Sequence, residues 1–215
     1  MITDILVIIA ILILSYLIGS INTAIIIGRI FDGDDIRSHG SGNAGATNAL
    51  RTYGVPAAIL VTLGDCFKAA VCCVIALLTS KLFPLNPASA KALLYIASIG
   101  VVLGHNFPLY FGFKGGKGIL VSVTALIFAD WRIGVTVLVI ALIIIAVTRY
   151  VSLGSVMGAV MFIIAALVLK RSDIYYTVST LFLGGLAIVR HRTNIKRLFN
   201  GTESKIGSNN QKGTK

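Results

Sequence analysis

The chain has 215 residues, of which 56% are hydrophobic and only 13% are charged. A soluble domain carries about 25% charged residues, and a soluble fold of this length could not bury so much apolar surface. The composition therefore predicts a membrane protein. The net charge of +11 could indicate nucleic-acid binding, but no basic stretch contains the interleaved aromatic residues that stack on bases. Basic loops that set membrane orientation explain the charge better, so we expect no nucleic-acid partner.

Apolar runs that are long enough to approach a bilayer crossing of about 20 residues recur along the chain. They cover residues 5–30, 55–80, 88–104, 119–147, 156–169 and 174–189. The fourth run is too long for one span, and its Asp130-Trp131-Arg132 triplet is typical of an interfacial turn. We divide it near 119–129 and 133–147, which predicts an all-α bundle of seven membrane-spanning helices. Five spans are the alternative, because 119–129 gives only ~17 Å of helix against the ~30 Å of hydrocarbon.

The basic residues predict the orientation of the chain. The N-terminus has no basic segment and no cleavage site, which indicates an uncleaved first span. If the N-terminus is outside, most of the 19 lysines and arginines fall on the face that carries the C-terminus, and that face should be cytoplasmic. We expect one transmembrane domain over residues 1–200 and a polar cytoplasmic tail over 201–215.

Four unusual stretches fall on this basic face. The first, Ser38 to Arg51, is rich in Gly, Ser, Asn and Thr, whose amides and hydroxyls can cradle a phosphate, and it ends in an arginine. It is not a Walker A loop, because no Gly-Lys-Ser/Thr follows. The second, Gly104 to Gly118, contains Lys-Gly-Gly-Lys-Gly at the start of a predicted helix, where anions bind well. A flexible linker and a basic anchor with aromatic neighbours are the structural alternatives for these two stretches.

The third stretch, Arg149 to Ser155, is as consistent with a small-residue helix start as with binding. The fourth, Arg190 to Lys205, is either a basic stop-transfer cluster or a set of ligand contacts, since it includes His191 and Asn194. Within the second span, Asp65 and Lys68 lie three residues apart and can pair on one helix face. We favour a structural ion pair there over a catalytic role.

At these four stretches the chain resembles the bacterial acyl-phosphate:glycerol-3-phosphate acyltransferases, the PlsY family. The matching residues are Gly40 to Asn48 with Arg51, Gly104 to Pro108 with Phe113 to Gly118, Ser152 to Ser155, and Arg190 to Arg192 with Asn194, Arg197, Gly201, Glu203 and Lys205. The arrangement of other acyltransferases, a histidine followed five residues later by aspartate, is absent.

The resemblance implies a multi-pass enzyme of the bacterial cytoplasmic membrane with its active site on the cytoplasmic face. It would move a fatty acyl group from acyl phosphate to the 1-hydroxyl of sn-glycerol 3-phosphate, giving 1-acyl-glycerol 3-phosphate (lysophosphatidic acid) and phosphate, the first acylation of phospholipid synthesis. The implied partners are these two substrates and membrane lipids, and the enzyme that makes acyl phosphate is left open as another. No cofactor and no metal are expected.

The resemblance also implies residue roles. Ser41 and Arg51 would hold phosphate groups, Lys114 with Lys117 nearby would neutralise the leaving phosphate, and Ser152 and Asn194 would orient the glycerol phosphate. Ligand contacts are expected from Gly42, Asn43, Gly45, Thr47, Asn48, His105, Gly115, Gly116, Lys117, His191 and Arg192. No residue is an obvious general base, so a phosphate oxygen of a substrate is the expected proton acceptor. The rival functions are a phosphate or glycerol-phosphate transporter and a scaffold that recruits anionic lipids.

Overall fold

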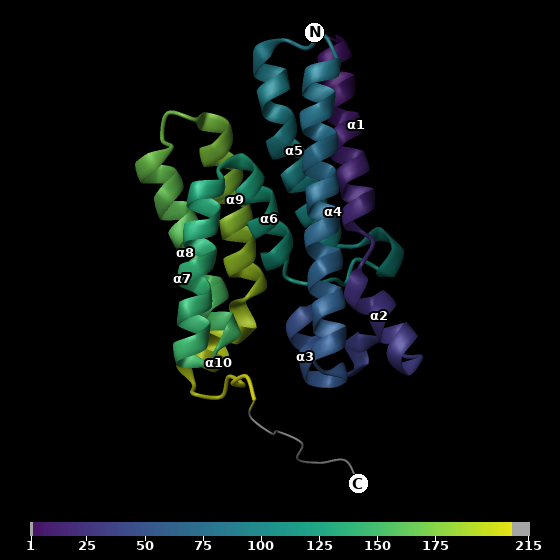
Figure 1. Cartoon of the computed structure of the whole chain (residues 1–215), viewed down its shortest axis with the longest axis vertical. Helices are drawn as coiled ribbons and strands as arrows, with labels where there is room; N and C mark the ends of the chain where they lie inside the picture. Colours follow the sequence, from purple (N-terminus) through teal and green to yellow (C-terminus); the bar gives the residue numbers. More distant parts are fainter. Residues whose placement is uncertain (1, 208–215) are drawn as a thin grey trace.

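The computed structural model describes residues 2–207, and all regular structure in this part of the chain is helical (Figure 1). Its α-helices are α1 (Ile2–Gly19), α2 (Thr23–Asp32), α3 (Ala46–Tyr53), α4 (Val55–Leu82), α5 (Pro87–Asn106), α6 (Ile119–Ala129), α7 (Trp131–Thr148), α8 (Val151–Leu169), α9 (Ile174–Arg190) and α10 (Arg192–Phe199). Two short 3-10 turns, Ile36–Ser38 and Leu109–Phe111, lie in the loops. The predicted all-α membrane fold is confirmed.

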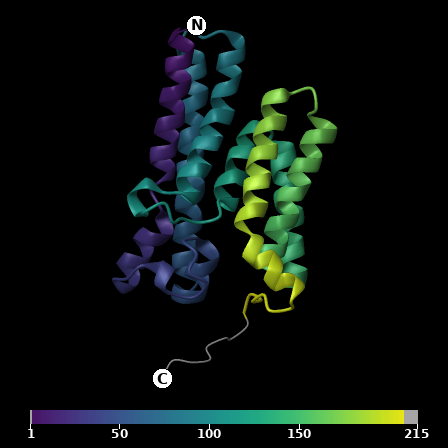
Figure 2. The same ribbon diagram turned by 180° about the vertical axis from the view of Figure 1, so that it is seen from behind.

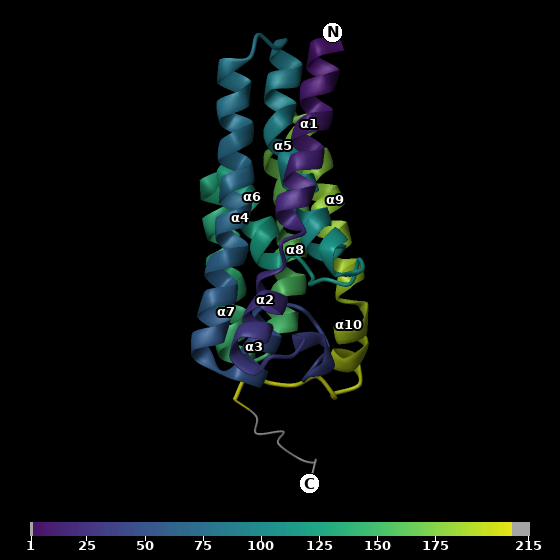
Figure 3. The same cartoon turned by 90° about the vertical axis from the view of Figure 1, so that its right-hand side faces the viewer.

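The helices form two groups that run alongside each other (Figures 1 and 2). One group contains α1, α4 and α5, and the other contains α7, α8 and α9. The short helix α6 packs against members of both groups, including α4 and α7. The helices α2, α3 and α10 gather at the end of the molecule opposite the N-terminus, which we call the site end (Figure 3).

The packing of α1 against α5 depends on glycine. A methyl group on Gly100 would lie 2.8 Å from the Leu12 carbonyl oxygen, and one on Gly104 would lie 2.7 Å from the backbone nitrogen of Ser20. Small residues let membrane helices approach this closely, because contact between helices, rather than exclusion of water, drives their association in lipid.

Within residues 2–207, five helices are long and apolar enough to cross a membrane, judged by length and composition: Ile2–Asp32, which joins α1 and α2, Val55–Leu82, Pro87–Phe111, Trp131–Thr148 and Val151–Leu169. The shorter apolar helices are α6 and α9. The predicted break within 119–147 is present, and Asp130 makes it by capping α7 through the backbone N–H groups of Arg132 and Ile133. The total of seven spans and the side on which each terminus lies remain predictions.

The predicted span over 5–30 falls within the candidate span Ile2–Asp32, but its helix is not continuous and breaks after Gly19. Asn22 accepts the Ile25 backbone N–H at 3.1 Å and starts α2 as a new helix. The break exposes the Ile21 carbonyl, which Lys68 Nζ contacts at 3.0 Å. Hydropathy alone could not reveal this capping contact.

Two short helices near the site were also not anticipated. Part of the predicted loop 38–51 is α3, which carries Thr47, Asn48 and Arg51, and part of the fourth stretch is α10. The span predicted from 156 begins earlier, since α8 starts at Val151 and includes Ser152 to Ser155.

Candidate active site

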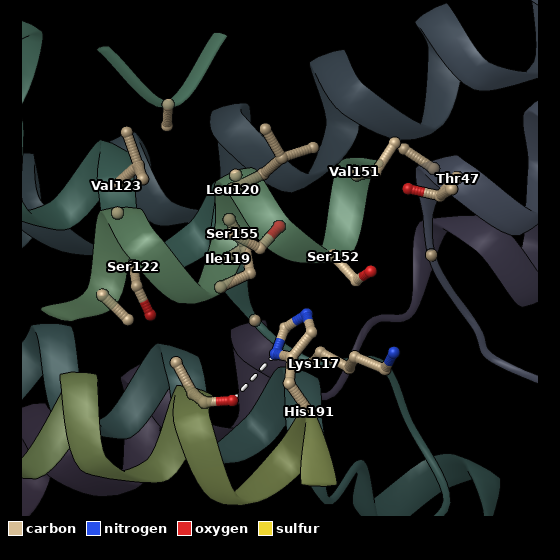
Figure 4. Close-up of a pocket in the computed structure, with 18 of the residues that line it drawn as sticks. Thr47, Lys117, Ile119, Leu120, Ser122, Val123, Val151, Ser152, Ser155 and His191 are labelled. Carbon is tan, nitrogen blue, oxygen red and sulfur yellow. Dashed lines mark hydrogen bonds between the residues drawn. The ribbon is translucent and has the colours of Figure 1, made fainter. Parts of the chain in front are cut away.

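A cavity of about 470 Å³ opens among the four stretches singled out from the sequence. Its polar end is lined by Ser41, Lys117, Ser152, His191 and Asn194, and its apolar end is lined by helices α6 to α9. In Figure 4, Lys117, His191 and Ser152 lie around the same space, with Thr47 on a neighbouring segment. Segments that are far apart in the sequence therefore converge on one amphipathic site.

The first wall comes from the loop before α3. Asn48 Oδ1 accepts the Ser41 backbone N–H at 2.8 Å, while its Nδ2 donates to the carbonyls of Ile36 at 3.1 Å and His39 at 3.0 Å. Both ends of this buried amide are occupied within the loop. Asn48 therefore fixes the position of Ser41, an exposed residue that lines the cavity.

Lys117 enters the cavity from the glycine-rich loop. The backbone N–H groups of Gly115 and Gly116 donate to the carbonyls of Asn106 and His105 at 3.2 and 3.1 Å. A methyl group on Gly116 would collide with the His105 ring and come within 2.7 Å of the Ala44 carbonyl oxygen. Only glycine lets this loop lie flat against the end of α5, and this placement directs Lys117 to Asn194, whose Oδ1 accepts its hydrogen bond.

Behind this loop is a buried ionic cluster. Lys68 Nζ lies 2.9 Å from Asp65 Oδ1 and 3.0 Å from His105 Nδ1, and the His105 nitrogen lies 3.4 Å from the same carboxylate oxygen. The ion pair expected between Asp65 and Lys68 is present. His105, expected as a ligand contact, lies in this cluster while also lining the cavity with Asp65.

Glu203 joins the third and fourth stretches. Its Oε1 accepts hydrogen bonds from Ser152 Oγ at 2.8 Å and Asn194 Nδ2 at 2.7 Å, and its Oε2 accepts one from Arg197 Nε at 2.7 Å. The Ile206 backbone N–H donates to the Arg149 carbonyl at 2.8 Å. Residues 201–207 of the predicted tail thus pack beside α8, while 208–215 lie outside the described residues.

The charges at the polar end follow from burial and neighbours. Burial lowers the pKa of Lys117 to about 8, and nearby arginines act in the same direction. Burial, followed by the charge of Lys117, lowers the pKa of His191 to about 4. Burial opposes ionisation of Glu203, but its hydrogen bonds from Asn194, Arg197 and Ser152 outweigh burial and lower its pKa.

His191 is therefore neutral near pH 7, and its tautomer follows from its partner. Its Nδ1 lies 2.8 Å from the Ala187 carbonyl oxygen, which can only accept (Figure 4). Nδ1 must carry the proton, so Nε2 has a free lone pair. The side chain can accept a hydrogen bond from a hydroxyl group of a ligand.

The structure brings most of the expected site residues to the cavity and leaves others out of its lining. Those that line it are Ser41, Asn43, Gly45, Thr47, Asn48, Arg51, His105, Lys117, Ser152, His191 and Asn194. Those that do not are Gly42, Lys114, Gly115, Gly116 and Arg192. Lys114 and Arg192 are exposed. The described residues contain no group of three or more His, Cys, Asp or Glu side chains that could hold a metal ion.

Sequence reasoning missed Glu203 as a site residue, although it stood among the residues of the resemblance. Its signal was that it is the sole acidic residue in a strongly basic stretch. A carboxylate in that position neutralises part of the positive charge and orders the donors around it.

The fold and the cavity together define a multi-pass membrane protein whose site combines cationic and small polar side chains with an apolar chamber. The family model of the glycerol-3-phosphate acyltransferases matches residues 9–201. The chain therefore belongs to the glycerol-3-phosphate acyltransferase family, of the PlsY type, and is an acyltransferase.

Individual relatives agree with this family over nearly the whole chain. The glycerol-3-phosphate acyltransferase of Clostridioides difficile (strain 630) is 41% identical over 199 residues, covering 93% of this chain and 95% of the relative. That of Thermoanaerobacter sp. (strain X514) is 44% identical over 195 residues, covering 91% and 93%.

Two solved structures of PlsY, an integral membrane glycerol 3-phosphate acyltransferase, share the fold. The glycerol 3-phosphate form has a TM-score of 0.80 and 32% identity, and covers 93% of this chain and 96% of its own. The lysophosphatidic acid form has a TM-score of 0.77 and 30% identity, and covers 93% and 95%.

Proposed function

We propose that this protein transfers a fatty acyl group from acyl phosphate to the 1-hydroxyl of sn-glycerol 3-phosphate, the first acylation step of phospholipid synthesis. It acts in the bacterial cytoplasmic membrane, with the site end in the cytoplasm. The products are 1-acyl-glycerol 3-phosphate and phosphate. The observation that carries the proposal is the amphipathic cavity, in which cations and small polar residues adjoin an apolar chamber.

The two substrates match the two ends of the cavity. Both carry phosphate, which Arg51, Lys117 and the loop around Ser41 can bind by charge-assisted hydrogen bonds. The acyl donor also has a long apolar tail, which leaves water when it enters the chamber between α6 and α9. A site for glycerol phosphate alone would have no use for that chamber.

The chemistry requires little beyond positioning and charge stabilisation. Acyl phosphate is already activated, so holding the glycerol hydroxyl against the acyl carbon supplies much of the acceleration. The new C–O bond forms as the bond from the acyl carbon to the phosphate oxygen breaks. Lys117 stabilises the charge that develops on the departing phosphate, and a phosphate oxygen takes the proton of the attacking hydroxyl. His191 Nε2 accepts a hydrogen bond from the other hydroxyl of glycerol phosphate and so orients the molecule.

The remaining expected roles stay proposals. Ser152 and Asn194 orient glycerol phosphate while Glu203 holds them in place. Lys114 was expected to neutralise the leaving phosphate, but it lies three residues before Lys117 and outside the cavity lining. We propose for it instead that it attracts the anionic substrates from solution. The enzyme that makes acyl phosphate is a proposed partner at the same membrane face.

A phosphate-release assay tests the function directly. Purified full-length protein in detergent is mixed with palmitoyl phosphate, with and without sn-glycerol 3-phosphate, and the lipid product is identified by mass spectrometry. We expect phosphate and lysophosphatidic acid in equal amounts, only when both substrates are present. Uptake of labelled glycerol phosphate into proteoliposomes without any acylated product would instead support a transporter.

The pH dependence of kcat/KM provides a test of Lys117. Because its pKa is lowered to about 8, the free enzyme loses the ammonium charge as the pH rises through that value, and kcat/KM should fall there. A Lys117→Arg variant keeps its charge, since a guanidinium stays protonated. In this variant the fall of kcat/KM at alkaline pH should occur at a higher pH than in the wild-type enzyme. If the fall occurred at the same pH, Lys117 would be excluded as the titrating group.

A further inference from the structure

The cavity ends at one depth on four different helices. Counting away from the site end, its last lining residues are Leu126 on α6, Val137 on α7, Phe162 on α8 and Leu183 on α9. Among the described residues, none farther along these four helices lines it. The cavity is thus a chamber with a floor, and it does not continue through the bundle.

The floor is densely packed. Leu126, Val137 and Phe162 are only 3–4% exposed and form one apolar cluster. Behind this cluster, Ile133 also packs against a second buried cluster that contains Ala166 and Tyr176. Two successive layers of side chains therefore separate the chamber from the end that carries the N-terminus, and Phe162 is the largest side chain of the first layer.

The depth of the chamber corresponds to one leaflet. Phe162 follows Ser152 by ten residues of the same helix, which is a rise of ~15 Å. The hydrocarbon core of a bilayer is ~30 Å thick, so the chains of one leaflet extend over ~15 Å. A tail that starts at the polar end would reach the floor at about the length of an ordinary membrane lipid chain.

We propose that Phe162, supported by Leu126 and Val137, is the length stop that sets the longest acyl chain the enzyme accepts. The inference rests on the proposed acyl transfer, and it assigns chain-length specificity to the end of the chamber. A tail longer than the chamber must either displace the floor or fold back. We therefore expect kcat/KM to fall steeply as the acyl chain grows beyond the length of the chamber, and to fall only gradually as the chain becomes shorter. One methylene group in a closed apolar pocket can change kcat/KM by about tenfold or more.

The test compares kcat/KM for lauroyl, myristoyl, palmitoyl, stearoyl and arachidoyl phosphates with saturating glycerol phosphate. Phe162→Ala deepens the chamber, and we expect the ratio of stearoyl to palmitoyl turnover to rise about tenfold. Ala159→Leu fills the chamber one helical turn nearer to the polar end, since Ala159 lines it as well. We expect this variant to favour myristoyl and lauroyl phosphate by a similar factor.

Phe182→Ala is the matched control, because Phe182 is 43% exposed on the outside of α9 and does not line the chamber. It should keep the wild-type profile. If Phe162→Ala fails to fold, Ala159→Leu and the wild-type profile still decide the matter. A wild-type profile with no fall on the long side, or two active variants with unchanged profiles, would overturn the length stop alone. Absence of any acyl transfer in the wild-type enzyme would overturn the proposed function, and the stop with it.

Discussion

Replacing Lys117 with alanine is expected to lower kcat for acyl transfer by about 10²–10³-fold, the range found when a preorganised group that stabilises transition-state charge is removed. Its ammonium group lies in the cavity beside Asn194, where burial strengthens its attraction for phosphate. The measurement is the steady-state rate of phosphate release from palmitoyl phosphate, at saturating concentrations of both substrates.

Lys114→Ala is the matched comparison, since it removes the same group from the same loop. Lys114 is exposed and outside the cavity lining, so its loss should raise KM by less than about tenfold and leave kcat nearly unchanged. High salt should reduce that difference, because screening weakens exposed charges. If Lys114→Ala instead abolished kcat while Lys117→Ala kept it, the two assignments would have to be exchanged.

Glu203→Ala is expected to lower both stability and turnover. It removes the acceptor for Ser152, Asn194 and Arg197, and each hydrogen bond to a charged group contributes about 1.5–3 kcal/mol. The variant leaves the Ser152 hydroxyl and the Asn194 amide buried without this acceptor. We therefore expect the free energy of unfolding to fall by roughly 3 kcal/mol. Thermal unfolding of the protein in detergent measures this loss, and the phosphate-release assay measures the loss of turnover.

Glu203→Gln should lie between the wild-type protein and the alanine variant. Its amide oxygen can still accept from Ser152 and Asn194, but its NH₂ group would face Arg197, which has no acceptor. Asp32→Ala, at an exposed carboxylate of the same end of the molecule, is the control and should behave like the wild-type protein. If the unfolding temperature and the turnover of Glu203→Ala were unchanged, the proposal that Glu203 holds Ser152 and Asn194 in place would be contradicted.

The membrane helices could be predicted from the sequence because lipid imposes a simple requirement. A spanning helix must be long and apolar, and this signal survives without knowledge of its neighbours. The break at Asp130 was visible for the same reason, since a charged triplet interrupts an apolar run. Convergence of the four stretches followed from placing their basic loops on one face.

The site-end details depend on contacts between distant residues, which a single sequence does not display. α3 contains weak helix formers such as Thr47 and Asn48, and its start at Gly45 has no side-chain cap. Lys114 and Lys117 have the same local pattern, but only the hydrogen bonds of Gly115 and Gly116 to the end of α5 determine which one enters the cavity. From the sequence alone Glu203 belongs to a polar tail, because its hydrogen bonds to Ser152, Asn194 and Arg197 are visible only in the folded chain.

The pairing of Asp65 with Lys68 has a consequence for biogenesis. Both charges belong to α4 and lie three residues apart, so they can neutralise each other within one newly made helix. The helix can enter the bilayer at a lower cost than two separate ions would incur, before α5 has been synthesised. His105 joins the pair only when α5 arrives, so insertion of α4 does not have to wait for assembly of the bundle.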